Sequence, residues 1–78
     1  MLNKEKLIKI VSTALGDIPI DEKSGSENLD DWDSLGHLSI LSALDNELNG
    51  KAADIDHLAS ADSFIKIYEI LKRNNLAE

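Results

Sequence analysis

The chain has 78 residues, of which 42% are hydrophobic and 29% charged, and its formal net charge is −7. A chain of this length and apolar content folds as a single globular domain, residues 1–78. The negative charge argues against nucleic acid binding, which requires clustered Lys and Arg. The absence of cysteine excludes disulfides and thiolate chemistry.

The first predicted element is an amphipathic helix over residues 4–15, with Asn3 as its N-cap and Gly16 as its stop. Lys4, Lys6 and Lys9 interrupt its apolar side chains. The segment therefore has neither the apolar core of a signal peptide nor the length of a bilayer span. We expect a cytoplasmic protein with no membrane span.

Residues 16–33 are predicted to form a long loop, because glycine, proline and polar residues follow one another there without sustained periodicity. Between residues 17 and 33 the chain has seven carboxylates and one lysine, a charge that steers basic partners. Two interpretations are open for Trp32: a ring partly buried against the next helix, or a recognition surface beside Ser34. The residues expected to anchor this loop in the core are Ile18, Ile20 and Leu29.

A second helix is predicted over residues 34–48, closed by Asn49 and Gly50. Its apolar residues cover more than half of the helix circumference, so it is either buried on several sides or lines a cavity. Residues 51–59 suggest one short helical turn around Ile55 and Leu58. A last amphipathic helix follows from residue 60 to 73, with Ser60 as its N-cap. The predicted fold class is all-α: a small four-helix bundle of three main helices and one short helix, with a long first loop.

Catalysis by the chain's own residues is not expected. Asp33, Ser34 and His37 have the composition of a hydrolase triad, but the end of one small helix supplies no oxyanion cleft. A calcium loop starting at Asp31 fails because Leu35 and Ser42 would occupy ligand positions. His37 and His57 lack zinc-ligand spacing, and both are expected to be solvated. We predict no catalytic residue and no metal site.

Ser34 instead suits modification by another enzyme. At a helix N-terminus its hydroxyl is exposed, and an attached phosphate would meet free backbone N–H groups and the positive end of the helix dipole. The alternative is that Asp33 or Ser34 is simply an N-cap.

The run Asp33-Ser34-Leu35, followed by leucines and carboxylates at helical spacing, resembles the acyl carrier proteins, the phosphopantetheine-binding carrier family. The resemblance covers the whole chain. It implies that a phosphopantetheinyl transferase attaches 4′-phosphopantetheine to Ser34, with Asp33 and Leu35 as flanking contacts, and that the thiol of the arm carries an acyl or aminoacyl thioester. The magnesium and the base would come from the transferase. A cavity for an apolar acyl chain is also implied, although ordinary core packing explains the same residues, which are Leu38, Leu41, Leu44, Ile65 and Tyr68.

The resemblance further implies a monomer that docks acyl-loading and acyl-processing enzymes through their basic surfaces. Gly36 and Ser39 stand where fatty-acid carriers usually have acidic residues, which favours a specialised pathway, such as polyketide, nonribosomal peptide or sugar-acyl systems, over standard fatty acid biosynthesis. The alternative function is a non-catalytic acidic helical interaction module without a prosthetic group. The residues expected to contact partners are Trp32, Gly36, His37, Asp45 and Glu47.

Overall fold

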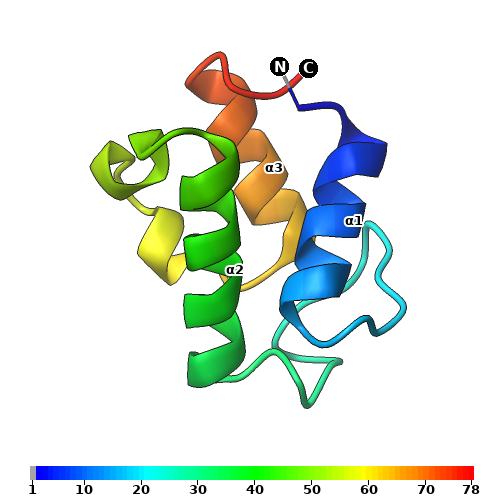
Figure 1. Cartoon of the computed structure of the whole chain (residues 1–78). Coiled ribbons are helices and arrows are strands. Elements are labelled where there is room, and N and C mark those ends of the chain that lie inside the picture. The colour runs from blue at the N-terminus through cyan, green and yellow to red at the C-terminus, as the bar shows by residue number, and fades with distance from the viewer. Residues whose placement is uncertain (1) are drawn as a thin grey trace.

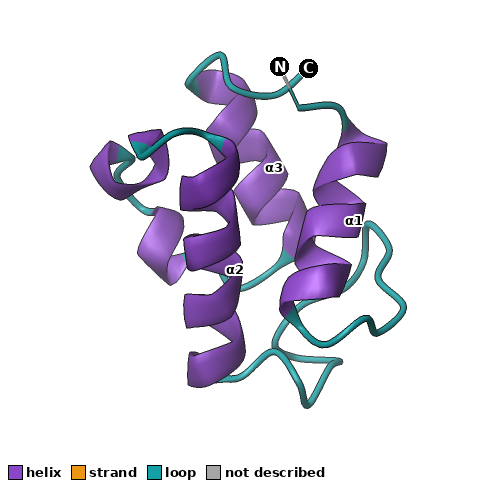
Figure 2. Cartoon of the chain, in the orientation of Figure 1, coloured by secondary structure: helices purple, strands orange, loops and turns teal. Residues whose placement is uncertain are grey.

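The computed structural model describes residues 2–78. Three α-helices and two short 3-10 turns make up its regular structure (Figure 1): α1 Lys4–Ala14, α2 Ser34–Glu47, η1 Lys51–Asp54, η2 Leu58–Ser60 and α3 Phe64–Arg73. Figure 2 shows helices and loops and no strand in the described part of the chain. The predicted all-α class is therefore confirmed. The single short helical turn expected within residues 51–59 is divided between η1 and η2.

A side-chain oxygen caps the start of each α-helix. Asn3 caps α1, Asp33 caps α2 and Ser63 caps α3, each accepting a hydrogen bond from the backbone N–H three residues further on. The prediction for Asn3 is confirmed, and of the two possible caps for α2 the structure uses Asp33. The prediction of Ser60 as the last N-cap is wrong. Its hydroxyl donates instead to the carbonyl of His57 within η2, and α3 begins about one turn later.

Two residues beyond the end of each α-helix lies a residue in the left-handed conformation, namely Gly16 (φ 98°), Asn49 (φ 57°) and Asn75 (φ 59°). The N–H groups of this residue and of the next one donate to carbonyls of the last helical turn, which is the Schellman arrangement. The stops predicted at Gly16 and at Asn49 with Gly50 are confirmed. These caps fix the directions in which the loops leave the helices.

The core lies between the three α-helices, and the long loop closes one end of it (Figure 1). The predicted loop anchors Ile18, Ile20 and Leu29 are partly buried and pack against the core, which confirms them. Gly25 forms an isolated antiparallel bridge with Ser63 and so attaches the loop to the start of α3. The largest fully buried side chains are Phe64, Leu7, Ile40, Leu44, Leu58, Ile67, Leu71 and Val11.

The two ends of the described chain lie side by side. Leu2 and Ala77 form a parallel bridge, and the N–H of Leu2 donates to the carbonyl of Leu76 over 3.1 Å. Figure 1 shows this junction at one end of the molecule and the start of α2 at the opposite end. The first turn of α2 is therefore remote from both ends.

Candidate functional site

Ser34 is the first residue of α2 and is exposed. Its neighbour Asp33 takes over the capping role by accepting from the N–H of Gly36 over 2.8 Å. Within residues 2–78 the Ser34 hydroxyl forms no side-chain hydrogen bond. The hydroxyl therefore does not cap the helix, a role that the structure gives to Asp33.

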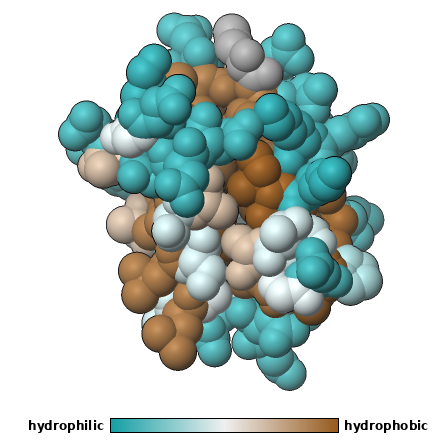
Figure 3. Space-filling view, in the orientation of Figure 1, coloured by the Kyte–Doolittle hydropathy of each residue, from teal (hydrophilic) through white to brown (hydrophobic). Residues whose placement is uncertain are grey.

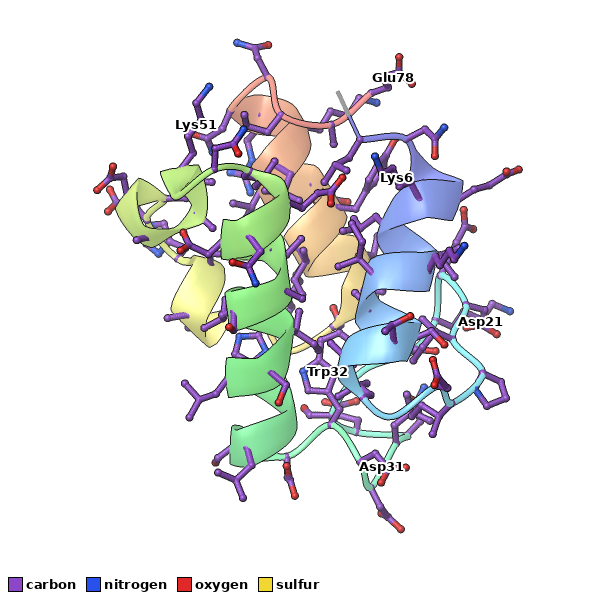
Figure 4. The ribbon with its side chains drawn as sticks, in the orientation of Figure 1. Lys6, Asp21, Asp31, Trp32, Lys51 and Glu78 are labelled. Atoms are coloured by element: carbon purple, nitrogen blue, oxygen red, sulfur yellow. The ribbon has the colours of Figure 1, made fainter. Side chains whose placement is uncertain are left out.

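The surface around Ser34 is apolar and lacks charged side chains along the helix. Leu35 and Leu38 keep 74% and 60% of their surface exposed, and Figure 3 shows apolar surface at this end of α2. No Asp, Glu, Lys or Arg occurs from Ser34 to Leu44, so the first carboxylate of α2 is that of Asp45. The negative charge near Ser34 comes from the loop that precedes it, where Asp31 extends from the tip (Figure 4).

Two adjoining hollows follow α2 on the side of the 3-10 turns. The first has a volume of about 640 Å³ and is bordered by Ser34, Leu38, Leu41 and Ala59 among others. The second, of about 280 Å³, is bordered by Leu41, Ala59 and Asp45. Both hollows are bordered by Leu41 and Ala59, so they adjoin along α2. The two hollows together are called the groove.

The predicted acyl cavity is only partly assembled by the structure. Leu38 and Leu41 border the first hollow, as expected. Leu44 is fully buried in the core instead, and Ile65, 39% exposed, lies on α3 outside the groove. Tyr68 stacks on the Phe64 ring and donates its hydroxyl to the carbonyl of Glu78. The structure thus brings only Leu38 and Leu41 of the five residues to one hollow, and a cavity lined by all five stays a prediction.

Trp32 and His37 form a partly buried link between the loop, α2 and η2. The indole ring of Trp32 is 2% exposed, and its Nε1–H donates to Nδ1 of His37 over 3.1 Å. Because Nδ1 accepts, the proton lies on Nε2, which is 3.1 Å from the carbonyl oxygen of Leu58 and donates to it. Trp32 therefore has the buried role, and His37 is half-buried and hydrogen-bonded rather than solvated as expected. That the two residues contact partners stays a prediction.

Gly36 has a steric role in the fold, and the partner contact expected for it stays a prediction. A Cβ at this position would lie 2.1 Å from the carbonyl oxygen of Asp31 and 2.9 Å from Cδ2 of Leu15. Only a residue without a side chain allows the loop backbone to approach the first turn of α2 so closely. Gly36 thereby contributes to the placement of the loop next to Ser34.

The two carboxylates predicted to bind partners differ in their surroundings. Glu47 forms an ion pair with Lys6, with 2.7 Å between the nitrogen and Oε1, and so connects α2 to α1. Asp45 is half-buried, and its Oδ1 is buried without any hydrogen-bond partner in residues 2–78. His57, the second histidine, is exposed at a positive φ of 71°, as expected for a solvated residue.

Exposed ion pairs flank the groove and the loop. The Lys66 ammonium lies 2.8 Å from Oδ1 of Asp62, and its hydrogen bond holds the pKa of that carboxyl below the usual value of 3.8. Lys4 pairs with Glu22 over 2.6 Å, which raises the pKa of the lysine and attaches the loop to α1. In residues 2–78, no group of three or more His, Asp or Glu side chains is arranged to hold a metal ion.

Several residues of the groove were not found from the sequence. Ala59 and Ser60 border the first hollow, and the Leu58 carbonyl receives the His37 hydrogen bond. The sequence feature that could have indicated the hollow is the small size of Ala59 and Ser60, which lie opposite the leucines of α2. The Leu58 carbonyl has no signal in the sequence, because any residue type presents one.

Comparison of the chain with protein-family models, with curated proteins and with solved structures gives no match. No helix in the described residues combines the length and the apolar character needed to span a bilayer.

Proposed function

We propose that the protein is a carrier that bears 4′-phosphopantetheine on Ser34 and presents an acyl or aminoacyl thioester to partner enzymes. The fold proposed to serve this role is the four-helix carrier bundle, with η1 and η2 in place of the short helix. One observation carries the proposal: an exposed serine hydroxyl at the first position of α2, freed from capping by the adjacent Asp33.

The residues around Ser34 fit this prosthetic group. The hydroxyl is accessible, and the first backbone N–H groups of α2 have no carbonyl partner within the helix, so they suit a phosphodiester. The Asp33 side chain occupies only one of these N–H groups, that of Gly36. The apolar wall provided by Leu38 and Leu41 suits the carbon-rich arm and its cargo. When attached, the arm would supply the thiol that a chain without cysteine lacks.

The chemistry assigned to the chain is limited to the Ser34 oxygen. That oxygen would attack the phosphorus of coenzyme A that bears the pantetheine, a phosphodiester would form, and 3′,5′-ADP would leave. No histidine or carboxylate forms a hydrogen bond with the Ser34 hydroxyl in residues 2–78, so the proton would pass to a base of the transferase. Asp33 and Leu35, exposed on either side, would contact that enzyme.

The surface also supports a proposal about partners. The proposed partners are the phosphopantetheinyl transferase and the enzymes that load and process the cargo. They would meet two different areas of the surface. The carboxylates of the loop attract basic surfaces, and the uncharged first turns of α2 present the exposed side chains of Leu35 and Leu38. A carrier helix without charge over its first eleven residues supports a specialised pathway rather than standard fatty-acid synthesis.

The test is a mass measurement. Purified protein is incubated with coenzyme A, magnesium and a broad-specificity transferase, and the intact mass is expected to increase by one phosphopantetheinyl group. Ser34→Ala should abolish the increase, whereas Ser39→Ala, which alters another exposed serine of α2, should leave it intact. An unchanged mass of folded wild-type protein, with the same transferase active on a reference carrier, would overturn the proposal.

A second candidate is an interaction module without a prosthetic group. It is favoured by the exposed Leu35 and Leu38 next to the acidic loop, because such apolar surface suits a protein contact. In that case partner binding should survive Ser34→Ala and weaken with salt. Protein isolated from its native cell should then have the mass of the unmodified chain.

A further inference from the structure

One side-chain hydrogen bond attaches the end of the long loop to α2. Residues 27–32 lie between the backbone bridge at Gly25 and the helix cap at Asp33. Within the described chain, the only side-chain hydrogen bond from residues 27–32 to a helix runs from Nε1 of Trp32 to Nδ1 of His37, over 3.1 Å. This acceptor therefore helps to hold the indole against α2.

The two linked side chains also form part of the first hollow. Trp32 and His37 both border it, and so does Ser34. Trp32 is 2% exposed, whereas His37 is half-buried. The hollow opens to solvent, so a proton from water reaches the imidazole more easily than water reaches the indole.

The bond exists only while the His37 ring is neutral. A neutral imidazole has one acceptor nitrogen, and here it is Nδ1, because Nε2 donates to the carbonyl oxygen of Leu58. A protonated ring carries a hydrogen on both nitrogens and has no acceptor left. Its Nδ1–H would face the Nε1–H of Trp32, while the bond to Leu58 would persist. A buried indole N–H without an acceptor is unfavourable, so the indole would leave its position.

The charged groups around the ring favour a positive charge on it. Asp33 borders the hollow from the loop, and Asp62 borders it from the segment after η2. The pKa of the Asp62 carboxyl is lowered mainly by Lys66 of α3, which pairs with it, and a charge on His37 adds to the effect. The turn η2 has no charged side chain, and α2 has no carboxylate before Asp45. Two carboxylates and one paired lysine thus surround the imidazole.

We propose that His37 is a proton-sensitive latch on the first hollow. With a neutral ring the latch is closed, and Trp32 lies against α2 as a wall of the hollow. When the ring takes up a proton, the bond to Trp32 breaks, the indole and the adjoining loop residues move away from α2, and the hollow widens beside Ser34. The latch needs no prosthetic group, so it operates whether or not the chain is a carrier.

The test follows both rings in the unmodified protein over the range from about pH 8 to about pH 5, in which histidines change charge. Nitrogen NMR of the imidazoles reports the protonation of His37 and of His57 separately. The emission maximum of Trp32 and its quenching by acrylamide report the exposure of the indole. As the pH falls, we expect emission to move to longer wavelength and quenching to rise, both with the midpoint of His37 protonation. Far-UV circular dichroism should stay constant, because the helices remain folded.

Variants separate the latch from a general effect of acid. In His37→Phe, emission and quenching should not depend on pH, because the ring has no nitrogen to protonate. His37→Gln, whose amide does not titrate either, gives the same readout if the phenylalanine variant does not fold. In His57→Asn, which removes the exposed histidine, the transition should remain.

Four results would each overturn the inference. The indole could stay buried while NMR shows a protonated His37 ring, or that ring could stay neutral down to about pH 5. The transition could persist in the folded His37 variants. It could also follow the protonation of His57 and disappear in His57→Asn.

Discussion

The helices α2 and α3 use their apolar residues in different ways. The ten-residue helix α3 buries four large apolar side chains, whereas the fourteen-residue helix α2 buries only Ile40 and Leu44. Leu35 and Leu38 of α2 stay largely exposed. The pattern of α3 is explained by the core of this chain, while α2 has more apolar surface than the fold requires. That excess, next to a free serine hydroxyl, is what a binding surface needs. The buried residues of α3 are Phe64, Ile67, Ile70 and Leu71.

The largest expected effect contrasts one residue from each helix. Phe64 is fully buried, so Phe64→Ala should lower the free energy of unfolding by about 3–5 kcal/mol, enough to leave a domain of this size close to unfolding. Leu38→Ala should change it by less than about 0.5 kcal/mol, because the side chain is already exposed. Urea denaturation measures both. Similar losses for the two variants would contradict the division of roles between α2 and α3.

A smaller loss of stability should come from breaking the hydrogen bonds that join Trp32, His37 and the Leu58 carbonyl. His37→Phe keeps a ring in place but leaves the Trp32 indole N–H and the Leu58 carbonyl without a partner, at a cost of about 1–3 kcal/mol. His57→Asn, at an exposed position with positive φ, is the control and should be nearly neutral. Thermal unfolding followed by circular dichroism compares them. If the His37 variant were as stable as the control, the link would have no structural role.

The smallest effect concerns the ion pair at the start of α3. The pKa of Asp62 is lower in the folded protein than its usual value of 3.8, because Lys66 donates to the carboxylate. The pair therefore stabilises the fold above that value, and its contribution is lost as the pH falls through the folded-state pKa. Asp62→Asn should lower the melting temperature slightly at neutral pH and not at all in strong acid. High salt should also remove the difference, since both groups are exposed.

The sequence was sufficient for most of the secondary structure. Capping residues and stops have local causes, so Asn3 and Gly16 delimit α1 correctly. The start of α3 was placed too early because Ala61 falls in phase with Phe64. In the structure Ala61 is buried from an extended segment, and Ser63, also a good cap, begins the helix.

The roles of residues near Ser34 depended on contacts that the sequence does not contain. His37 bonds to a carbonyl 21 residues away, and Gly36 is required by the backbone of Asp31 on a loop that folds back. Both residues stand beside Ser34, the proposed attachment site, so the sequence suggested partner contacts for them. Their actual neighbours are set by the packing of the loop and η2, which follows from the whole fold.

The placement of Trp32 has a practical consequence. It is the only tryptophan of the chain, it is shielded from water, and it borders the same hollow as Ser34. The tryptophan fluorescence of the protein therefore originates beside Ser34. Emission from this indole should change when the proposed arm or its cargo enters the hollow, so the proposed attachment could be followed in real time without an added dye.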